Sequence, residues 1–503
     1  MGTSLAESGT APRGAERMVS DREIPAYGEV TPELLDALRA IVGEKNVLTE
    51  PAELLVYECD GYTLERLPPQ AVVLPGNTDE VSQVLTLLYE AGVPFIPRGA
   101  GTSLAGSTIA VRGGVIVGLS RMRRIREIDL ANRIAVLEAG VVNIWVTQAV
   151  EKEGFFYAPD PSSQGACTIG GNVATNAGGP HTLKYGVTLN HVLGVEMVLA
   201  DGQVVQLGGR AEDPFGYDLT GFVVGSEGTL GLVTQVTVRL TRAPQAYRTL
   251  LAIFDSVDDA TQTVSAIIRQ GIVPAAVEMM DRLIIQAVEE AYHFGFPTDA
   301  AAVLIIELDG LEAGIDALVS QVIGICEEHR AREIRRARTE AERKALWASR
   351  KRAFGAVGRL SPSFVTQDGV VPRTKLPEIL RIVTAVGAKY NLRVANVFHA
   401  GDGNIHPLIL FDENDPDQVE RVLAASDEIL NACIDLGGSV TGEHGIGIEK
   451  IEHLARMFTP EDLEVMTRLQ DAFDPHDRCN PGKLFPSSKG CIEVKRPRPK
   501  APA

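Results

Sequence analysis

Paired cysteines, long apolar runs and an excess of basic residues are all missing from this sequence of 503 residues. Its six cysteines are scattered and no two form C-x-x-C, which argues against an iron–sulfur cluster in this chain and favours a reducing compartment. No apolar run approaches ~18 residues, so no membrane-spanning helix is predicted. Because 66 acidic residues outnumber 48 basic ones and the formal net charge is −18, we expect no nucleic-acid partner.

Both ends of the sequence also lack the patterns of a folded or targeting segment. Residues 1–23 have no apolar signal-peptide core, and residues 487–503 are basic and rich in proline, so both are predicted to be disordered tails. We therefore expect a cytoplasmic protein, with peripheral association with the inner membrane through partners as the alternative.

A βαβ unit is predicted early in the chain. Thr31 and Pro32 begin a first helix, and apolar strands at 71–75 and 93–97 flank a capped helix over 77–92. A right-handed crossover makes the two strands parallel. The segment that follows the second strand therefore leaves its carboxyl end, where open α/β sheets bind ligands.

The rest of the chain changes in texture. Short strands alternate with glycine-rich turns up to a linker predicted near 243–247. Beyond it, strand and helix patterns suit an antiparallel sheet covered by helices: strands 250–256, 275–280 and 301–310, and helices 258–271, 311–330 and 459–475. We predict a first domain over 24–245, a second over 246–460 and a C-terminal segment over 461–486.

Glycine is concentrated in three segments, 97–107, 160–179 and 224–231. The first resembles a phosphate-binding loop, but Ser107 stands where a P-loop has lysine, and Leu104 interrupts G-x-G-x-x-G. Glycine lets backbone N–H groups approach an anion closely, and neighbouring Ser, Thr and Asn add donors; simple tight turns are the alternative. Without the lysine, the segments predict an intact pyrophosphate, as in a dinucleotide cofactor, rather than phosphoryl transfer.

A second group of residues has the chemistry of a metal site. His399 and His406 flank the turn sequence G-D-G-N, so a hairpin can bring the two imidazoles within reach of one ion. Glu443 in T-G-E-H-G-I-G (441–447) offers a third ligand, which leaves an open coordination position, as in catalytic Zn²⁺, Mn²⁺ or Fe²⁺ sites. The adjacent His444 is then free to act as a base.

The three glycine-rich segments, in this order, resemble the FAD-binding domain of the vanillyl-alcohol-oxidase type flavoproteins. Thr102 replaces the histidine that often tethers FAD in that family, so the resemblance implies non-covalent FAD. The residues it places around the cofactor are Pro97, Arg98, Gly99, Ala100, Gly101, Thr102, Ser103, Leu104, Gly165, Thr168, Gly170, Gly171, Asn172, Thr175, Asn176, Gly178, Gly179, Tyr185, Glu227, Gly228, Gly231, Asn480 and Lys483.

F-H-A-G-D-G-N-I-H-P (398–407) and T-G-E-H-G-I-G resemble the C-terminal domain of the FAD-linked D-2-hydroxyacid dehydrogenases. The resemblance implies that His399, His406 and Glu443 bind a divalent metal, zinc or manganese, and that His444 is the catalytic base. Arg350, with Lys351 as the alternative, matches an arginine that binds the substrate carboxylate. Asn480 and Lys483 match a closing motif that returns to the flavin.

Together the resemblances imply an α+β fold. It has a two-subdomain FAD-binding domain of the vanillyl-alcohol-oxidase (PCMH) type, a ferredoxin-like antiparallel-sheet cap domain, and a C-terminal helical segment that returns to the flavin domain. Within the family, residues 30–486 are most similar to the flavin subunits of bacterial glycolate oxidases. F-V-T-Q-D-G-V-V-P (364–372) lacks the lysine-containing stretch of the 2-hydroxyglutarate branch.

The expected reaction is oxidation of a small 2-hydroxy acid anion, glycolate to glyoxylate, with hydride transfer to flavin N5. Reduced flavin then needs an acceptor, and the resemblance implies companion flavin and iron–sulfur subunits or a quinone. Three alternatives remain open at this point: a dehydrogenase of D-lactate or another D-2-hydroxyacid, a non-catalytic flavin-binding assembly subunit, and a metal hydrolase that would leave the glycine-rich segments unexplained.

Overall fold

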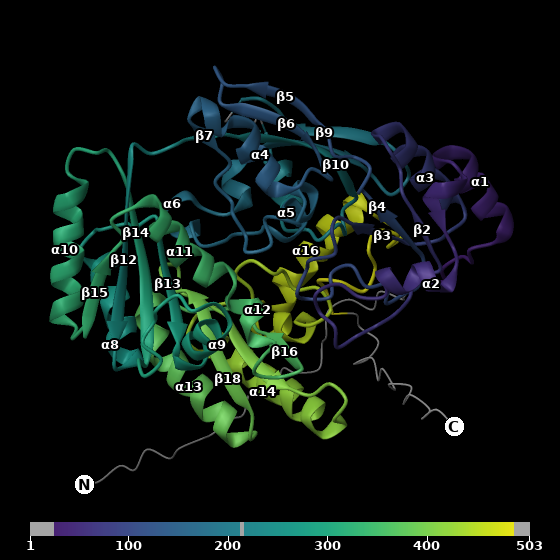
Figure 1. The fold of residues 1–503 in the computed structure, drawn as a ribbon. Coiled ribbons are helices and arrows are strands. Elements are labelled where there is room, and N and C mark those ends of the chain that lie inside the picture. Colours follow the sequence, from purple (N-terminus) through teal and green to yellow (C-terminus); the bar gives the residue numbers. More distant parts are fainter. Residues whose placement is uncertain (1–24, 212–215, 487–503) are drawn as a thin grey trace, which may run out of the picture.

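A computed structural model describes residues 25–211 and 216–486, and two sheets dominate its N-terminal half, up to residue 242 (Figure 1). The first sheet has the strand order β1-β2-β4-β3: β1 (Val47–Leu48), β2 (Ala71–Val73), β4 (Val115–Gly118) and β3 (Phe95–Arg98). The second is antiparallel, in the order β5-β6-β10-β8-β9: β5 (Ile125–Asp129), β6 (Ile134–Glu138), β10 (Leu232–Arg239), β8 (Val192–Val198) and β9 (Val204–Gly208). A small pair joins β7 (Phe155–Phe156) to β11 (Thr241–Arg242).

Several helices of the N-terminal half begin at a residue whose side chain caps them. Thr31 Oγ1 accepts from the N–H of Leu34, 3.3 Å away, and Asn77 caps the helix that links β2 to β3. The α-helices are α1 (Pro32–Val42), α2 (Pro51–Leu54), α3 (Thr78–Glu90), α4 (Asn143–Val150), α5 (Ile169–Thr175), α6 (Thr182–Tyr185) and α7 (Leu219–Val223). Short 3₁₀ turns are η1 (Glu44–Asn46), η2 (Leu55–Tyr57), η3 (Glu151–Glu153) and η4 (Thr188–His191).

The predicted βαβ unit is present, with one addition. The strands β2 and β3 are parallel, as expected, but β4 lies between them and pairs with both. The turn after β3 still leaves the carboxyl end of the strand, so the loop at 97–107 opens from the predicted edge of the sheet.

The C-terminal half is built on a large sheet whose strands pair antiparallel. Its path is β15-β12-β14-β13-β18-β19-β17, and β16 joins it through β20, which pairs with β18. The strands are β12 (Ala246–Phe254), β13 (Ala276–Asp281), β14 (Ala302–Gly310), β15 (Glu333–Arg336), β16 (Ser363–Thr366), β17 (Gly369–Val370), β18 (Arg393–His399), β19 (Asn404–Ile405) and β20 (Pro407–Phe411). The linker prediction was wrong for residues 246–247, because Ala246 already pairs with Gly310 as the first residue of β12.

Helices cover this sheet and bury its apolar side chains. They are α8 (Val257–Arg269), α9 (Arg282–Tyr292), α10 (Ile315–Glu328), α11 (Glu340–Lys351), α12 (Ala353–Val357), α13 (Leu376–Lys389) and α14 (Pro416–Asp435), with the 3₁₀ turn η5 (Arg373–Lys375). The 3₁₀ turn η6 (Ile451–His453), α15 (Leu454–Met457) and α16 (Pro460–Phe473) follow, and Leu454 and Leu463 pack with Leu430 of α14 and with Val440 and Ile446. No helix within the described ranges has the length and apolar character needed to cross a membrane.

The end of the described chain returns to the N-terminal half. Figure 1 shows α16 and the following segment, in yellow, on the side of the blue and purple elements. Cys479 forms a parallel bridge with Phe95 of β3. The N–H of Phe95 donates to the carbonyl of Arg478 over 2.9 Å, and the N–H of Asn480 donates to the carbonyl of Phe95 over 2.8 Å. These contacts hold the two halves together beside the loop at 97–107.

Candidate active site

A cavity of about 690 Å³ lies where the two halves meet, and its wall is drawn from both. The C-terminal half contributes Lys351, His406, Glu443 and His444, among other residues. The predicted cofactor residues that line it are Pro97, Arg98, Gly99, Ala100, Gly101, Thr102, Ser103, Leu104, Thr168, Gly170, Gly171, Asn172, Thr175, Glu227, Gly228 and Gly231. All three glycine-rich segments therefore face one space.

Close backbone packing explains why α5 begins with glycines. Thr168 caps this helix by accepting from the N–H of Gly171, 3.3 Å away. A Cβ on Gly170 would lie 2.7 Å from the Cβ of Ala139 and 3.0 Å from its carbonyl oxygen. Only a residue without a side chain fits against Ala139, the residue that follows β6, and Gly170 lines the cavity from this position.

Seven predicted cofactor residues do not line the cavity: Gly165, Asn176, Gly178, Gly179, Tyr185, Asn480 and Lys483. The Asn480 side chain donates to the carbonyls of Ser107 and Glu227, at 2.9 and 2.7 Å, and Lys483 Nζ donates to the carbonyl of Ile109 at 2.7 Å. These two residues support the cofactor loops from behind instead of facing the cofactor space. The Tyr185 hydroxyl donates to the carboxylate of Asp309.

The predicted metal ligands come together at one edge of this cavity. His399 ends β18, His406 lies between β19 and β20, and Glu443 lies on the 441–447 loop. The Oε1 atom of Glu443 is 3.1 Å from His399 Nε2 and 3.2 Å from His406 Nε2. One ligand atom from each of the three residues lies within 4.8 Å of the others, a spacing that a single cation can bridge.

The sequence suggested that the two histidines face each other across the hairpin, but they are not direct cross-strand neighbours. His399 pairs with Asn404, and the same register sets Asn396 opposite Pro407, so His406 is offset by two residues along the ladder. Side chains two residues apart still share a face of the sheet. The rings therefore meet diagonally, perpendicular to each other, with centroids 5.1 Å apart.

A buried carboxylate stands behind His399. Both oxygens of Glu278, on β13, lie 2.8 and 2.9 Å from His399 Nδ1. With Nδ1 held by Glu278, the other ring nitrogen, Nε2, points toward Glu443. Metal-binding histidines typically use one ring nitrogen for the metal and donate the other N–H to a carboxylate in this way. Burial opposes a charge on His399, but Glu278 and Glu443 outweigh it and raise the pKa of the ring well above its ordinary value. Burial also opposes a charge on Glu443, but His399 and His406 outweigh it and hold the pKa of this carboxyl well below its usual range.

Arg350 lies behind this cluster, away from the cavity lining. Its Nε donates to Glu278 over 2.7 Å, and its side chain is buried. The two terminal guanidinium nitrogens have no hydrogen-bond partner within the described residues. The neighbouring Lys351 lines the cavity instead, so the alternative named from the sequence is the one that reaches the cavity.

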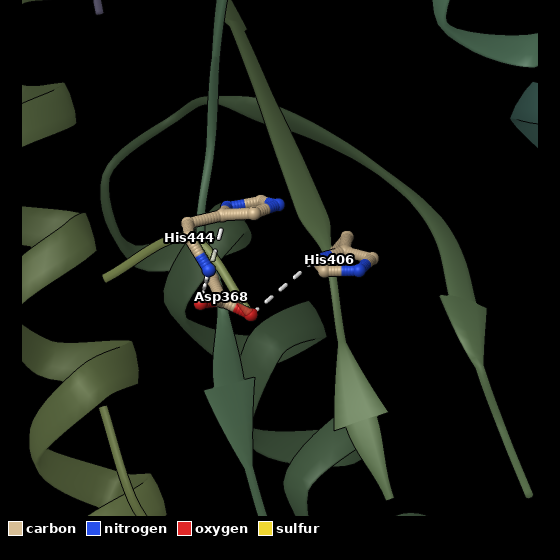
Figure 2. Close-up of side chains that lie close together, drawn as sticks. All are labelled: Asp368, His406 and His444. Atoms are coloured by element: carbon tan, nitrogen blue, oxygen red, sulfur yellow. Dashed lines mark hydrogen bonds and ion pairs between the residues drawn. The ribbon is translucent and has the colours of Figure 1, made fainter. Parts of the chain in front are cut away.

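Asp368, which no sequence motif singled out, organises the loop that carries Glu443 and His444. Its Oδ2 accepts from the Thr441 hydroxyl at 2.7 Å and from the N–H groups of Gly442, Glu443 and His444 at 3.0, 3.2 and 2.9 Å. Figure 2 shows this carboxylate beside the His406 and His444 rings, which stack with centroids 4.9 Å apart.

Burial sets the protonation state of the His444 ring. His444 Nδ1 lies 4.0 Å from Asp368 Oδ2, and its Nε2 lies 3.8 Å from Glu443 Oε1. Burial lowers the pKa of His444 to about 4, and the nearby Asp368 offsets this only in part. The ring is therefore neutral at pH 7 and able to accept a proton.

A second group, Asp368 with His406 and His444, also has ligand atoms within 4.8 Å of one another. Oδ2 of Asp368 already accepts from four donors of the 441–444 loop and lies 3.5 Å from the ammonium of Lys450, whereas Oδ1 has no hydrogen-bond partner within the described residues. A cation beside Asp368 would face this ammonium. His399, His406 and Glu443 therefore form the better ligand set, with carboxylate and imidazole atoms free of backbone donors.

Two family models cover most of the chain. Residues 69–208 match the model of an FAD binding domain, and residues 243–484 match that of the C-terminal domain of FAD linked oxidases. A bacterial relative that is 45% identical covers 92% of this chain. The chain belongs to the family of FAD-linked oxidases, as the resemblance implied.

The individual relatives extend over nearly the whole chain. "Glycolate oxidase subunit GlcD" of Escherichia coli (strain K12) is 45% identical over 460 residues, which cover 92% of each chain. A "D-lactate dehydrogenase" of Anaerostipes hadrus is 31% identical over 469 residues, covering 91% of this chain and 98% of the relative. A solved structure of p-cresol methylhydroxylase superposes with a TM-score of 0.77 at 19% identity, over 90% of this chain and 96% of that chain. The fold class predicted from the sequence is confirmed.

Proposed function

We propose that this chain oxidises a short 2-hydroxy acid, glycolate above all, to the corresponding 2-oxo acid. The observation that carries the proposal is a shared cavity: His406, Glu443 and His444 line the same space as the three glycine-rich segments. Oxidation of a 2-hydroxy acid removes a proton from the hydroxyl group and a hydride from the adjacent carbon. A base and a two-electron acceptor must therefore face one substrate, and the two walls of this cavity supply places for both.

The residues present fit the two groups that this chemistry needs. Glycine backbone and hydroxyl side chains form a wall suited to the pyrophosphate of FAD, and Thr102 in that wall supports non-covalent binding. His399, His406 and Glu443 suit a divalent ion, zinc or manganese. When bound, FAD supplies the two-electron acceptor and the ion supplies Lewis acidity toward the substrate hydroxyl.

His444 acts as the base in this scheme. Its ring lines the cavity, with Asp368 4.0 Å from Nδ1 and Glu443 3.8 Å from Nε2, and both carboxylates stabilise the ring once it has taken up the proton. General-base assistance of this kind is worth ~10²–10⁴-fold in rate. Lys351, on the cavity wall, provides a positive charge for the substrate carboxylate, while Arg350 steadies Glu278 behind His399.

The acceptor of the electrons lies outside this chain in the proposal. The Escherichia coli relative is named as a subunit, which supports companion subunits. We infer that a flavin or iron–sulfur partner, or a quinone, reoxidises the cofactor. We place the chain in the cytoplasm, with inner-membrane association through such a partner as the alternative.

An anaerobic titration of the FAD-loaded protein tests the proposal. Glycolate should bleach the flavin absorbance with formation of glyoxylate, and D-lactate should do so less efficiently. D-lactate is the second candidate substrate because of the D-lactate dehydrogenase relative. Faster bleaching by D-lactate would reassign the substrate. A flavin that no short 2-hydroxy acid reduces would contradict the enzyme and leave a flavin-binding assembly subunit.

A separate measurement tests the metal. Elemental analysis of the purified protein should find zinc or manganese, and prolonged chelation should lower the rate of flavin reduction. Full activity in a metal-free sample would limit His399, His406 and Glu443 to hydrogen-bonding roles.

A further inference from the structure

Glu227 joins segments that lie far apart in the sequence. The residue is 3% exposed and adopts φ of +51°, a left-handed conformation that is uncommon outside glycine. Its N–H donates to the carbonyl of Ala174 over 2.8 Å, and its carbonyl accepts from the Asn480 side chain over 2.7 Å. The backbone is therefore held on both sides, and the carboxylate points in a defined direction.

The carboxylate of Glu227 receives donors from both halves of the molecule. From the N-terminal half, the Ser107 hydroxyl donates to Oε2 over 2.6 Å. From the C-terminal half, the N–H of Ile446 donates to Oε1 over 2.6 Å, and the N–H of Gly447 donates to both oxygens, at 3.1 and 2.9 Å. Each oxygen thus has two donors already, so the carboxylate has little capacity left for a bound cofactor.

The glycines of the 441–447 loop fit around this contact. A Cβ on Gly445, where φ is +83°, would lie 2.7 Å from Oε1 of Glu227. A Cβ on Gly447, where φ is +55°, would lie 1.9 Å from the carbonyl oxygen of Ala105. The loop is therefore seated directly on the cofactor-binding half, with no space for side chains at these two positions.

We propose that Glu227 is a positioning residue that holds His444 in register with the cofactor wall of the cavity. This inference rests on the proposed function. Ile446 and Gly447 follow His444 in the same short loop, so holding their N–H groups restrains the ring. Proton and hydride leave the same substrate, so both acceptors must be aligned at once, and a misplacement of about 1 Å can cost ~10²-fold in rate. Charge-assisted hydrogen bonds to a buried carboxylate are strong enough to hold such a position.

The substitution Glu227→Gln keeps the size of the side chain and replaces one accepting oxygen with an amide group. Glu138→Gln is the matched control, because Glu138 is equally buried in the same half, accepts from the N–H of Arg124 at 2.7 Å and does not line the cavity. We expect E227Q to retain one FAD per chain and to reduce its flavin at least about 10-fold more slowly. The substrate concentration for half-maximal rate should change by less than about threefold, and E138Q should match the wild type.

Ser107→Ala is a milder variant that serves if E227Q does not fold. It removes one donor to the carboxylate and leaves the bonds to the 441–447 loop, so its flavin reduction should slow in the same direction by a smaller factor. Wild-type rates in E227Q, or in S107A where that is the variant available, would overturn the positioning role. Loss of FAD from a folded E227Q would also overturn it, because the residue would then act on cofactor binding.

Hydrogen exchange of the FAD-loaded protein measures the same contact without turnover. Amides in the 441–447 segment should exchange faster in E227Q, or S107A, than in the wild type and E138Q. Unchanged exchange would overturn the inference. If no 2-hydroxy acid reduces the wild-type flavin, the proposed function fails, whereas the exchange measurement still decides whether Glu227 holds the loop.

Discussion

The two walls of the cavity differ in the kind of atom that they present. The N-terminal wall consists largely of glycine backbone with hydroxyl and amide side chains, whereas the C-terminal wall presents His406, Glu443, His444 and Lys351. A wall rich in glycine backbone binds by close fit. The buried ionisable groups in and behind the C-terminal wall need partners, because an unpaired buried charge is costly.

Those partners are visible behind the charged wall. Glu278 contacts His399, and Asp368 holds the backbone of the loop that carries Glu443 and His444. Substitutions in the two walls should therefore impair different properties. Changes in the charged wall should slow the reaction, and changes in the glycine wall should weaken cofactor binding.

Replacing His444 by alanine should have the largest effect on the rate of flavin reduction. Loss of the base should slow flavin reduction by ~10²–10⁴-fold, while FAD stays bound at one per chain because the glycine wall is intact. Anaerobic stopped-flow measurement of flavin bleaching gives the rate, and the visible spectrum gives the FAD content. Near-native reduction in H444A would remove the proposed base.

The substitution Glu278→Gln tests the support behind the charged wall. Removing an outer partner of a metal-binding histidine typically lowers metal affinity by ~10–100-fold, so E278Q should lose its ion at lower chelator concentration than the wild type. Glu307→Gln is the control, because Glu307 is also buried in the same sheet but contacts Arg343, Trp347 and Thr249 instead of the cluster. Equal metal retention in E278Q and E307Q would contradict this role.

Two glycines of the segment 160–179 test the glycine wall through its affinity for FAD. Gly170→Ala places a Cβ against Ala139 and should raise the dissociation constant of FAD about 10-fold, or about 1.4 kcal/mol. A Cβ on Gly165 meets nothing within 4 Å, and this residue does not line the cavity, so Gly165→Ala should bind FAD normally. Titration of the apoprotein with FAD measures both, and equal affinities would argue against close fit as the basis of binding.

The contact between the halves gives a prediction about stability and not about rate or binding. Burial opposes a charge on His181, but Asp160, 2.8 Å from Nδ1, and Glu307 raise the pKa of the ring from 6.5 to about 10. The protonated ring therefore stabilises the fold fully below pH 6.5, and this contribution is lost as the pH rises toward 10.

Thermal unfolding measured between pH 6.5 and 10 checks this sign. The melting temperature of the wild type should fall with rising pH, and His181→Gln should show a shallower fall from a lower starting value. Parallel curves for the two proteins would mean that His181 carries no such linkage.

Much of the local structure could be predicted because it depends on neighbouring residues. Thr31 and Asn77 cap helices as expected, and the strands around 71–75 and 93–97 form where apolar residues run together. The insertion of β4 between β2 and β3 was not predicted, because strand pairing depends on contacts between distant segments.

In the candidate site, too, the residues in short motifs could be predicted, whereas the contacts between distant segments could not. His399, His406, Glu443 and His444 were named from two short motifs, and the structure brings them together, although with a diagonal register. Glu278 had one local indication, a lone acidic residue within the apolar strand A-A-V-E-M-M (275–280). No local pattern pointed to Asp368 as the acceptor for the 441–444 loop.

The sequence by itself determined which chemistry was available: glycine-rich loops for close approach to a cofactor, and imidazole and carboxylate groups for a metal and a base. Tertiary structure alone decided which group supports which. Glu278 and His399 are 121 residues apart, and Glu227 and Ile446 are 219 apart. Such pairs form only when sheets and loops pack, because a hydrogen bond depends on position in space and leaves no periodic trace along the chain.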